Sequence, residues 1–210
     1  MTRAITARPI LPRSFYERDT ITVARQLLGQ ILVHSPANPE PACAGRIVEV
    51  EAYVGSYEGE PDRAAHSHRG LTSRTRVIFG PAGHAYVYLV YGLHECLNIV
   101  AEPGGVPGCV LIRALEPVSG VEVMRQRRPA ARREAELCSG PGNLTRAMAV
   151  SLQLYGADLT DPASPLTVRA APSPAPAEEI LSAPRVGIRH CADWPLRFYL
   201  AGHPSVSRYP

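Results

Sequence analysis

The stretch AYVYLVYGLHECLNIVA, residues 85–101, consists of two apolar segments separated by a glycine at position 92. Aromatic and branched residues, which dominate both segments, favour extended strands, and a short break that contains Gly is typical of a hairpin. Tyr91 and Gly92 fall at the expected tip of that hairpin. Two strands with so short a connection pair in antiparallel fashion. We therefore predict a protruding β-hairpin and an antiparallel sheet around it.

Two more strands are predicted on either side of this hairpin in the sequence. Residues 44–54, AGRIVEVEAYV, alternate between apolar and polar positions, which places Glu49, Glu51 and Tyr53 together on one face. A half-buried strand normally exposes such a polar face to solvent. Residues 108–115, GCVLIRAL, are expected to form the other strand, with Arg113 as its only charge. The centre of the chain is therefore rich in strands.

Helices are expected on both sides of this central region. Residues 14–29 have an apolar stripe, with Asp19 or Thr20 as the N-cap and Gly29 as a stop signal. Shorter helical segments are expected at about 118–128 and 141–153, and loops are expected throughout 55–84. The predicted fold class is α+β, a single compact domain with a mainly antiparallel curved β-sheet, flanking helices and the protruding hairpin.

The length of 210 residues suits one domain with its own hydrophobic core. We assign residues 1–13 to a loose N-terminal arm and residues 14–210 to the single domain. Within that domain, residues 161–179 are rich in Pro, Ala and Ser, a composition that predicts a flexible loop.

The composition excludes several classes of protein. No apolar run is long enough for a membrane span, and the N-terminus lacks the apolar segment of a signal peptide, so we expect a cytoplasmic protein. The five cysteines form no CxxC pair, which indicates reduced thiols. The sequence contains 22 basic residues and no lysine, so a Schiff-base mechanism has only the N-terminal amine available.

The net charge of +3 is ordinary, but the arginines are clustered locally. Within nine residues the sequence places five of them: Arg125, Arg127, Arg128, Arg132 and Arg133. Such a cluster forms either a solvated helical face or a face that contacts phosphates.

Four sets of residues are candidates for chemistry. Glu51 and Tyr53 would place a carboxylate beside an aromatic ring, although a surface Glu and a half-buried Tyr is the simpler interpretation. Tyr86, Tyr88 and Tyr91 form the second set, and the simpler interpretation is that they pack on the sheet. Alternatively, Tyr91 at the hairpin tip inserts as a wedge between base pairs. The HxH pair of His66 and His68 has no third ligand at a recognisable spacing, so we expect no metal.

The fourth candidate is Arg113, a charge in an apolar strand. Its parity groups it with Cys109, Leu111 and Leu115. A charge in such a position needs a partner or a ligand, for which Glu51 and a phosphate are both suitable. The alternative is an arginine on an edge strand that reaches solvent.

Six ordered blocks carry a resemblance that covers roughly residues 14 to 207. They read EVEAYVG, DRAAHSHRG, GPAGHAYVYLVYGLHECLNIV, GCVLIRALEP, LCSGPGNLTRAMAV and RVGIRHCADWPLRFYLAGHPSVS. Together they resemble the alkyladenine-type 3-methyladenine DNA glycosylase family, also called methylpurine DNA glycosylases. The resemblance implies an enzyme of base excision repair that removes alkylated or deaminated purines from double-stranded DNA after base flipping. It implies no cofactor, and we expect a monomer.

The resemblance also implies roles for individual residues. Glu51 would be the general base and Arg113 would help hold the water. The base pocket and the wedge would comprise Tyr53, Tyr88, His66 at the base edge, Asn98 at the floor and Tyr91 in the duplex gap. The segment between Tyr53 and His66 is longer than the family's usual spacing, so either His66 or His68 would supply the edge contact. Without a lysine, strand cleavage by β-elimination is not expected.

Three other interpretations compete with this one. Glu49 and Glu51 share a face, and a glycoside hydrolase needs two carboxylates that flank the bond, roughly 5–9.5 Å apart. We instead take Glu49 as structural or solvent-exposed. A non-catalytic binder of damaged DNA would keep the tyrosines and arginines but would have no use for Glu51. A glycosylase of the helix-hairpin-helix class is disfavoured because no motif of that kind is present.

Overall fold

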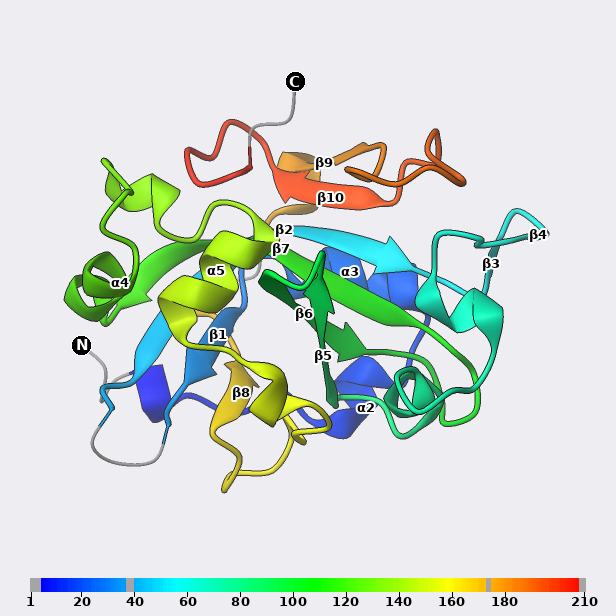
Figure 1. The fold of residues 1–210 in the computed structure, drawn as a ribbon, viewed down its shortest axis with the longest axis horizontal. Coiled ribbons are helices and arrows are strands. Elements are labelled where there is room, and N and C mark those ends of the chain that lie inside the picture. The colour runs from blue at the N-terminus through cyan, green and yellow to red at the C-terminus, as the bar shows by residue number, and fades with distance from the viewer. Residues whose placement is uncertain (1–4, 37–39, 173–174, 208–210) are drawn as a thin grey trace.

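The two longest strands, β2 (Cys43–Tyr53) and β7 (Cys109–Ser119), pair antiparallel along their length at the centre of the sheet. The computed structural model describes residues 5–36, 40–172 and 175–207. Both predicted strands are present, and β7 extends beyond the predicted residue 115. These two strands, which carry the predicted Glu51 and Arg113, run side by side through the middle of the molecule (Figure 1).

The remaining strands extend the sheet on both sides of this pair. The predicted hairpin is formed by β5 (Ala85–Val90) and β6 (His94–Val100), and β6 pairs with β7. On the other side, β1 (Ile31–His34) pairs with the first residues of β2, and β10 (Arg197–Leu200) pairs with its last residues. The sheet is completed by β8 (Leu166–Arg169) beside β1 and β9 (Ile180–Ala183) beside β10. A separate small sheet pairs β3 (Ser56–Tyr57) with β4 (Glu60–Pro61).

Helices cover both faces of the central strands. The single helix predicted over 14–29 is split into two, α2 (Arg13–Tyr16) and α3 (Thr20–Leu27). Asp19 caps α3, because its carboxylate accepts hydrogen bonds from the backbone N–H groups of Ile21 and Thr22. In Figure 1, α3 lies behind β2 and β7, whereas α5 (Pro141–Met148) lies in front of β6 and β7. A further α-helix, α4 (Val121–Arg127), follows strand β7 in the chain.

In the described residues, five short 3₁₀ helices lie in the connections: His66–Arg69, Arg76–Phe79, Glu134–Glu136, Leu152–Leu154 and Ala177–Glu179. The first two lie in the long 55–84 connection that the sequence predicted as loops. Ala64, His66 and Arg74 of this connection line the same cavity as residues of β5 and β6.

Two regions differ from the sequence-based expectation. Within residues 161–179, expected to form a loop, Leu166–Arg169 form β8, because these alternating residues find a partner in β1. Residues 5–13, expected to be a loose arm, are joined to the sheet: Ile5 is buried, and Arg169 donates to the backbone oxygens of Thr6 and Arg8. Residues 1–4 and 173–174 lie outside the described chain.

The exposed polar face expected for β2 is also wrong. Glu49 and Glu51 are both fully buried, because β2 is a central strand whose polar face is covered by the C-terminal segment and by residues near Val186. A charge buried in this way must be paired or neutralised. The fold is nevertheless the predicted one, a single α+β domain with a mainly antiparallel sheet.

Candidate active site

One face of β2, β5, β6 and β7 forms the floor and walls of a cavity of about 710 Å³. Side chains alternate along a strand, so residues two apart reach the same side of the sheet. Cys109, Leu111 and Arg113 of β7 all line the cavity, whereas Leu115, which the predicted parity grouped with them, does not. A volume of this size suits a small planar ligand. All the site residues predicted from the sequence line it: Glu51, Tyr53, His66, Tyr88, Tyr91, Asn98 and Arg113.

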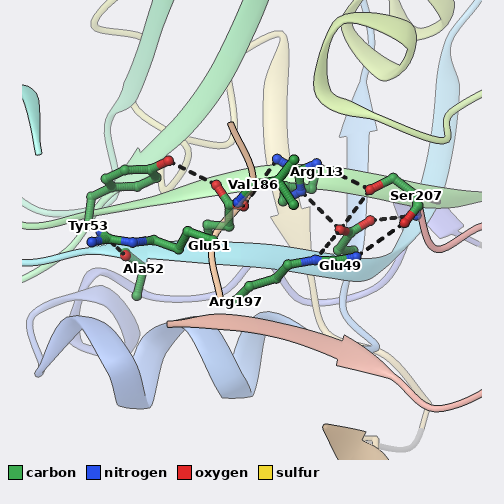
Figure 2. A network of polar contacts seen from close by, with 9 residues as sticks. Glu49, Glu51, Ala52, Tyr53, Arg113, Val186, Arg197 and Ser207 are labelled. Atoms are coloured by element: carbon green, nitrogen blue, oxygen red, sulfur yellow. Dashed lines mark hydrogen bonds and ion pairs between the residues drawn. The ribbon is translucent and has the colours of Figure 1, made fainter. Parts of the chain in front are cut away.

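The carboxylate of Glu51 is held by three donors (Figure 2). Its Oε1 accepts a hydrogen bond from the backbone N–H of Val186 at 2.7 Å and lies 3.1 Å from Nη1 of Arg113. Its Oε2 accepts from the hydroxyl of Tyr53 at 2.9 Å. The Glu51 side chain is fully buried in protein, yet it lines the cavity. The carboxylate is therefore fixed in position at the cavity wall.

An irregular register explains why Arg113 reaches both carboxylates of β2. Glu49 lies opposite Ala114 and Val50 lies opposite Ile112, so Arg113 is the extra residue of a β-bulge on β7. Such bulges redirect side chains and are common next to functional sites. The prediction that Arg113 needs a partner is confirmed, because it pairs with Glu51 and also with Glu49, whereas an edge-strand arginine open to solvent is excluded.

Burial and the neighbouring charges together shift the pKa values of Glu51 and Arg113. Burial raises the pKa of Glu51 above its ordinary value, although Arg113, the Val186 N–H and the Tyr53 hydroxyl all oppose that increase. Burial by itself would lower the pKa of Arg113, but the two carboxylates raise it, so the guanidinium stays charged. Glu51 is therefore a carboxylate more basic than an ordinary glutamate, next to a permanent cation.

Aromatic rings form the walls of the cavity. Tyr88 stacks on Tyr86 with ring centroids 5.2 Å apart and an interplanar angle of 27°. His66 meets Tyr88 edge-to-face at 4.6 Å, and its Nδ1 lies 2.8 Å from the hydroxyl of Tyr86. Burial lowers the pKa of His66 to about 4, with a further contribution from Arg74, so the imidazole is neutral at neutral pH. His68 is exposed and does not line the cavity, which leaves His66 as the histidine of the predicted pair that does.

The floor of the cavity includes a fixed amide. Asn98 of β6 is 2% exposed and lies opposite Tyr86 in the hairpin register. Its Nδ2 donates to the backbone oxygen of Tyr86 at 3.2 Å, while its Oδ1 lies 3.8 Å from the thiol sulfur of Cys109. The amide of Asn98 thus cannot rotate freely.

The hairpin tip contrasts with these buried walls. Tyr91 is 88% exposed and Leu93 is 78% exposed, and Tyr91 also lines the mouth of the cavity. The φ angles of Tyr91 and Gly92 are 52° and 67°, the left-handed pair of a tight hairpin turn. Glycine adopts such an angle readily, but a tyrosine does not, so this position carries backbone strain in order to present the ring outward.

Sequence reasoning missed a buried ion pair behind Tyr53. Arg185 donates to both carboxylate oxygens of Asp62, at 2.6 and 2.9 Å, and both side chains are fully buried. The guanidinium also lies over the ring of Tyr53, 4.7 Å from its centroid, and donates to the backbone oxygen of Ala52. The pair therefore packs against the ring of Tyr53 although neither of its residues lines the cavity. No spacing signal relates positions 62 and 185.

The predicted arginine cluster is largely neutralised by carboxylates. Arg125 pairs with Glu134, Arg127 pairs with Glu40 and Arg133 pairs with Glu136, each within 3.1 Å. A second hollow of about 490 Å³ lies beside this segment and is lined by Arg113, Arg128 and Arg133. These pairs favour the interpretation of a solvated face for most of the cluster.

The described residues contain no group of three or more His, Cys, Asp or Glu side chains that could hold a metal ion. Within the same residues, no helix is long and apolar enough to cross a membrane.

A fixed carboxylate, aromatic walls and an exposed aromatic residue at the mouth together define an enzyme site for a planar ring rather than for a sugar polymer. Among the residues that the structure describes, Glu51 is the one carboxylate that lines the cavity, so Glu49 does not form with it the carboxylate pair of a glycoside hydrolase. An arrangement of this kind is expected of a DNA glycosylase, which must hold an extruded base.

The comparisons with known proteins agree. The sequence model of the methylpurine-DNA glycosylase (MPG) family matches residues 14–204. A protein of Methanoculleus marisnigri named as a 3-methyladenine DNA glycosylase is 52% identical over 200 residues, which cover 94% of this chain and 98% of that protein. A protein of the same name from Nocardia farcinica is 49% identical over 192 residues, covering 91% and 87% of the two chains. The chain belongs to the methylpurine-DNA glycosylase family.

Proposed function

We propose that this protein hydrolyses the N-glycosidic bond of alkylated or deaminated purines in double-stranded DNA and leaves an abasic site. The substrates would include 3-methyladenine, 7-methylguanine, hypoxanthine and ethenoadenine. One observation carries the proposal: Glu51 is a buried carboxylate whose partners fix it at the wall of a cavity lined by aromatic rings. The names of the relatives, which specify 3-methyladenine, support the same substrate class.

Extrusion of the damaged nucleotide would come first, because the glycosidic bond is inaccessible inside the stack. Extrusion costs a few kcal/mol, and less for a damaged base. Stacking of the base between Tyr53 and Tyr88 would return about 1–3 kcal/mol. The exposed ring of Tyr91 is placed to enter the gap that the base leaves in the duplex.

Glu51 would then act as general base on a water at the sugar. The sugar becomes oxocarbenium-like as the bond breaks, and a nearby carboxylate stabilises that charge. A base works best when its pKa lies near the working pH, which agrees with the raised pKa of Glu51. Arg113 would keep the carboxylate ionised and help hold the water.

Two residues would distinguish damaged bases from normal ones. The neutral imidazole of His66 would contact the edge of the base, and the fixed amide of Asn98 would disfavour guanine through its exocyclic amine. Methylated purines that carry a positive charge leave readily and need little help from an acid. The absence of lysine from the sequence supports a monofunctional enzyme that stops at the abasic site.

The test uses end-labelled duplex DNA with a single ethenoadenine or hypoxanthine, without added metal. Strand breaks are scored with and without hot alkali for the wild type, for Glu51→Gln, and for Glu60→Gln as a matched control on the exposed strand β4. We expect breaks only after alkali, their loss in Glu51→Gln, and no change in Glu60→Gln. Breaks without alkali would contradict the monofunctional assignment.

A non-catalytic binder of damaged DNA is the alternative. Such a protein would produce no abasic sites from any purine lesion but would still bind lesion-containing duplex tightly. Its affinity would be the same in the wild type and in Glu51→Gln. That result would overturn the catalytic proposal.

A further inference from the structure

Glu49 lies two residues from Glu51 on the same strand, but its surroundings differ completely. Its side chain is fully buried and accepts four hydrogen bonds (Figure 2). Oε1 accepts from Nε of Arg113 at 2.9 Å, from Nε of Arg197 at 2.7 Å and from the hydroxyl of Ser207 at 2.8 Å. Oε2 accepts from the backbone N–H of Ser207 at 2.7 Å. Glu49 is thus held by four short contacts and does not line the cavity, so it is not placed to contact a substrate there.

The guanidinium of Arg113 is divided between the two carboxylates. Its Nε binds Glu49, its Nη1 lies 3.1 Å from Glu51, and its Nη2 donates to the hydroxyl of Ser207 at 3.2 Å. The planar fork of an arginine fixes the direction of all its donors at once. Rotation of the group away from Glu51 would therefore break its bonds to Glu49 and Ser207.

We propose that Glu49 is a positioning residue that directs Arg113 toward Glu51 and, together with Arg197, sets how much positive charge the catalytic carboxylate feels. The inference rests on the proposed function of Glu51 as the general base. Arg197 is on β10, and Ser207 is in the C-terminal segment, so this segment forms part of the support of the active site. Glu49 acts on the reaction only through Arg113 and through its own charge.

The sign of each effect follows from the charges. Glu49→Gln removes a negative charge near Glu51, which favours the ionised form of Glu51. The same change loosens the anchoring of Arg113, which is expected to lower the plateau rate. Arg197→Gln removes a cation that neutralises Glu49, so more negative charge remains near Glu51 and its ionised form is disfavoured. The other titratable groups that interact with Glu51 would be unchanged in both variants: Tyr53, Cys96 and Arg185.

The experiment measures release of 7-methylguanine from duplex DNA under single-turnover conditions as a function of pH. This lesion already carries its positive charge, so the acid limb of the profile reports the base. We expect the limb to move to lower pH in Glu49→Gln and to higher pH in Arg197→Gln, each by on the order of one pH unit. A purely structural role would lower the rate in both variants without opposite shifts. Limbs that stay in place or move in the same direction would overturn the proposal.

Ser207→Ala is the matched control, since it removes two hydrogen bonds from the same cluster, those with Glu49 and Arg113, without any change of charge. Its acid limb is expected to coincide with that of the wild type, with only the plateau rate reduced. A shift of its limb by as much as in the charge variants would contradict the proposal. If Glu49→Gln does not fold, the direction of the Arg197→Gln shift decides the question. A wild type that releases no base at any pH would refute the proposed function instead.

Discussion

The site has a rigid side, around Glu51 on β2, and an exposed side, around Tyr91 at the hairpin tip. The two sides differ most in how firmly the chain holds them. Glu51 lies on a central strand, is fully buried, and has a partner for each carboxylate oxygen. Tyr91 lies at a hairpin tip and is 88% exposed, with a strained backbone. Both residues line the same cavity. A reacting group must be held in one position, whereas a residue that meets DNA must be presented to solvent. The sheet holds Glu51 as the proposed base requires, and the turn exposes Tyr91 as the proposed wedge requires.

The largest effect is expected at the rigid side. Glu51→Gln keeps the size of the side chain but removes the base, so the single-turnover rate should fall by about 10²–10⁴-fold. Because the defect lies in the chemical step, duplex and single-stranded lesion substrates should be affected alike. Quench-flow or manual time courses with saturating enzyme measure this rate. A loss confined to duplex DNA would mean that Glu51 acts in extrusion, and the two sides of the site would not be separable.

The buried Arg185–Asp62 pair, which packs against Tyr53, is tested through the free energy of unfolding rather than through the reaction rate. Arg185→Leu leaves Asp62 buried without its partner, and such a loss typically costs about 3–5 kcal/mol in the free energy of unfolding. Arg125→Leu breaks an exposed pair with Glu134 and should cost at most about 1 kcal/mol. Urea unfolding followed by circular dichroism compares the two variants. Equal costs would show that the buried pair does not support the site.

A smaller effect is expected at the exposed side. Tyr91→Ala removes a ring that would fill the duplex gap, a contact worth about 1–3 kcal/mol, so duplex excision should fall by roughly ten- to hundred-fold. Excision from single-stranded DNA should be almost unchanged, since no gap forms there. Leu181→Ala, an exposed apolar residue of β9 outside the cavity lining, is the matched control. If Tyr91→Ala excised lesions from duplex DNA as fast as the wild type, the assignment of Tyr91 as the wedge would be wrong.

Sequence periodicity was sufficient where the site lies on strands. The alternation in 44–54 and 85–101 predicted both the strands and the side chains that share a face, because the cavity occupies a single face of the sheet. The tip at Tyr91 followed from Gly92 and the short connection. Asp19 was one of two predicted caps, and it is the one whose side chain binds the first turn of α3. Local rules therefore gave the strands and the side chains that share a face, whereas Asn98 and the roles of the site residues came from the resemblance to the family.

The supporting contacts could not be predicted in this way, because they join distant parts of the chain. Ser207 and Glu49 are 158 residues apart, and Arg185 and Asp62 are 123 residues apart. The burial of Glu49 depends on β10 and the C-terminal segment, so alternation alone could not decide between a structural and a solvent-exposed Glu49. Strand β8 was missed for a related reason, since its Pro-rich surroundings hide four residues whose partner, β1, lies far away in sequence.

The smallest expected effect concerns His66, which lies between the two sides of the site. Its ring touches Tyr88 of the hairpin, and burial lowers its pKa to about 4. A lowered pKa means that the neutral form is favoured on folding, so protonation should occur only as the pH falls toward 4 and not between pH 5 and 8. An NMR titration of the seven histidines, with His66→Gln to assign the signal, should show this one midpoint far below the ordinary 6.5. A titration midpoint near 6.5 would mean that solvent reaches the imidazole of His66, so that this part of the cavity wall is not buried.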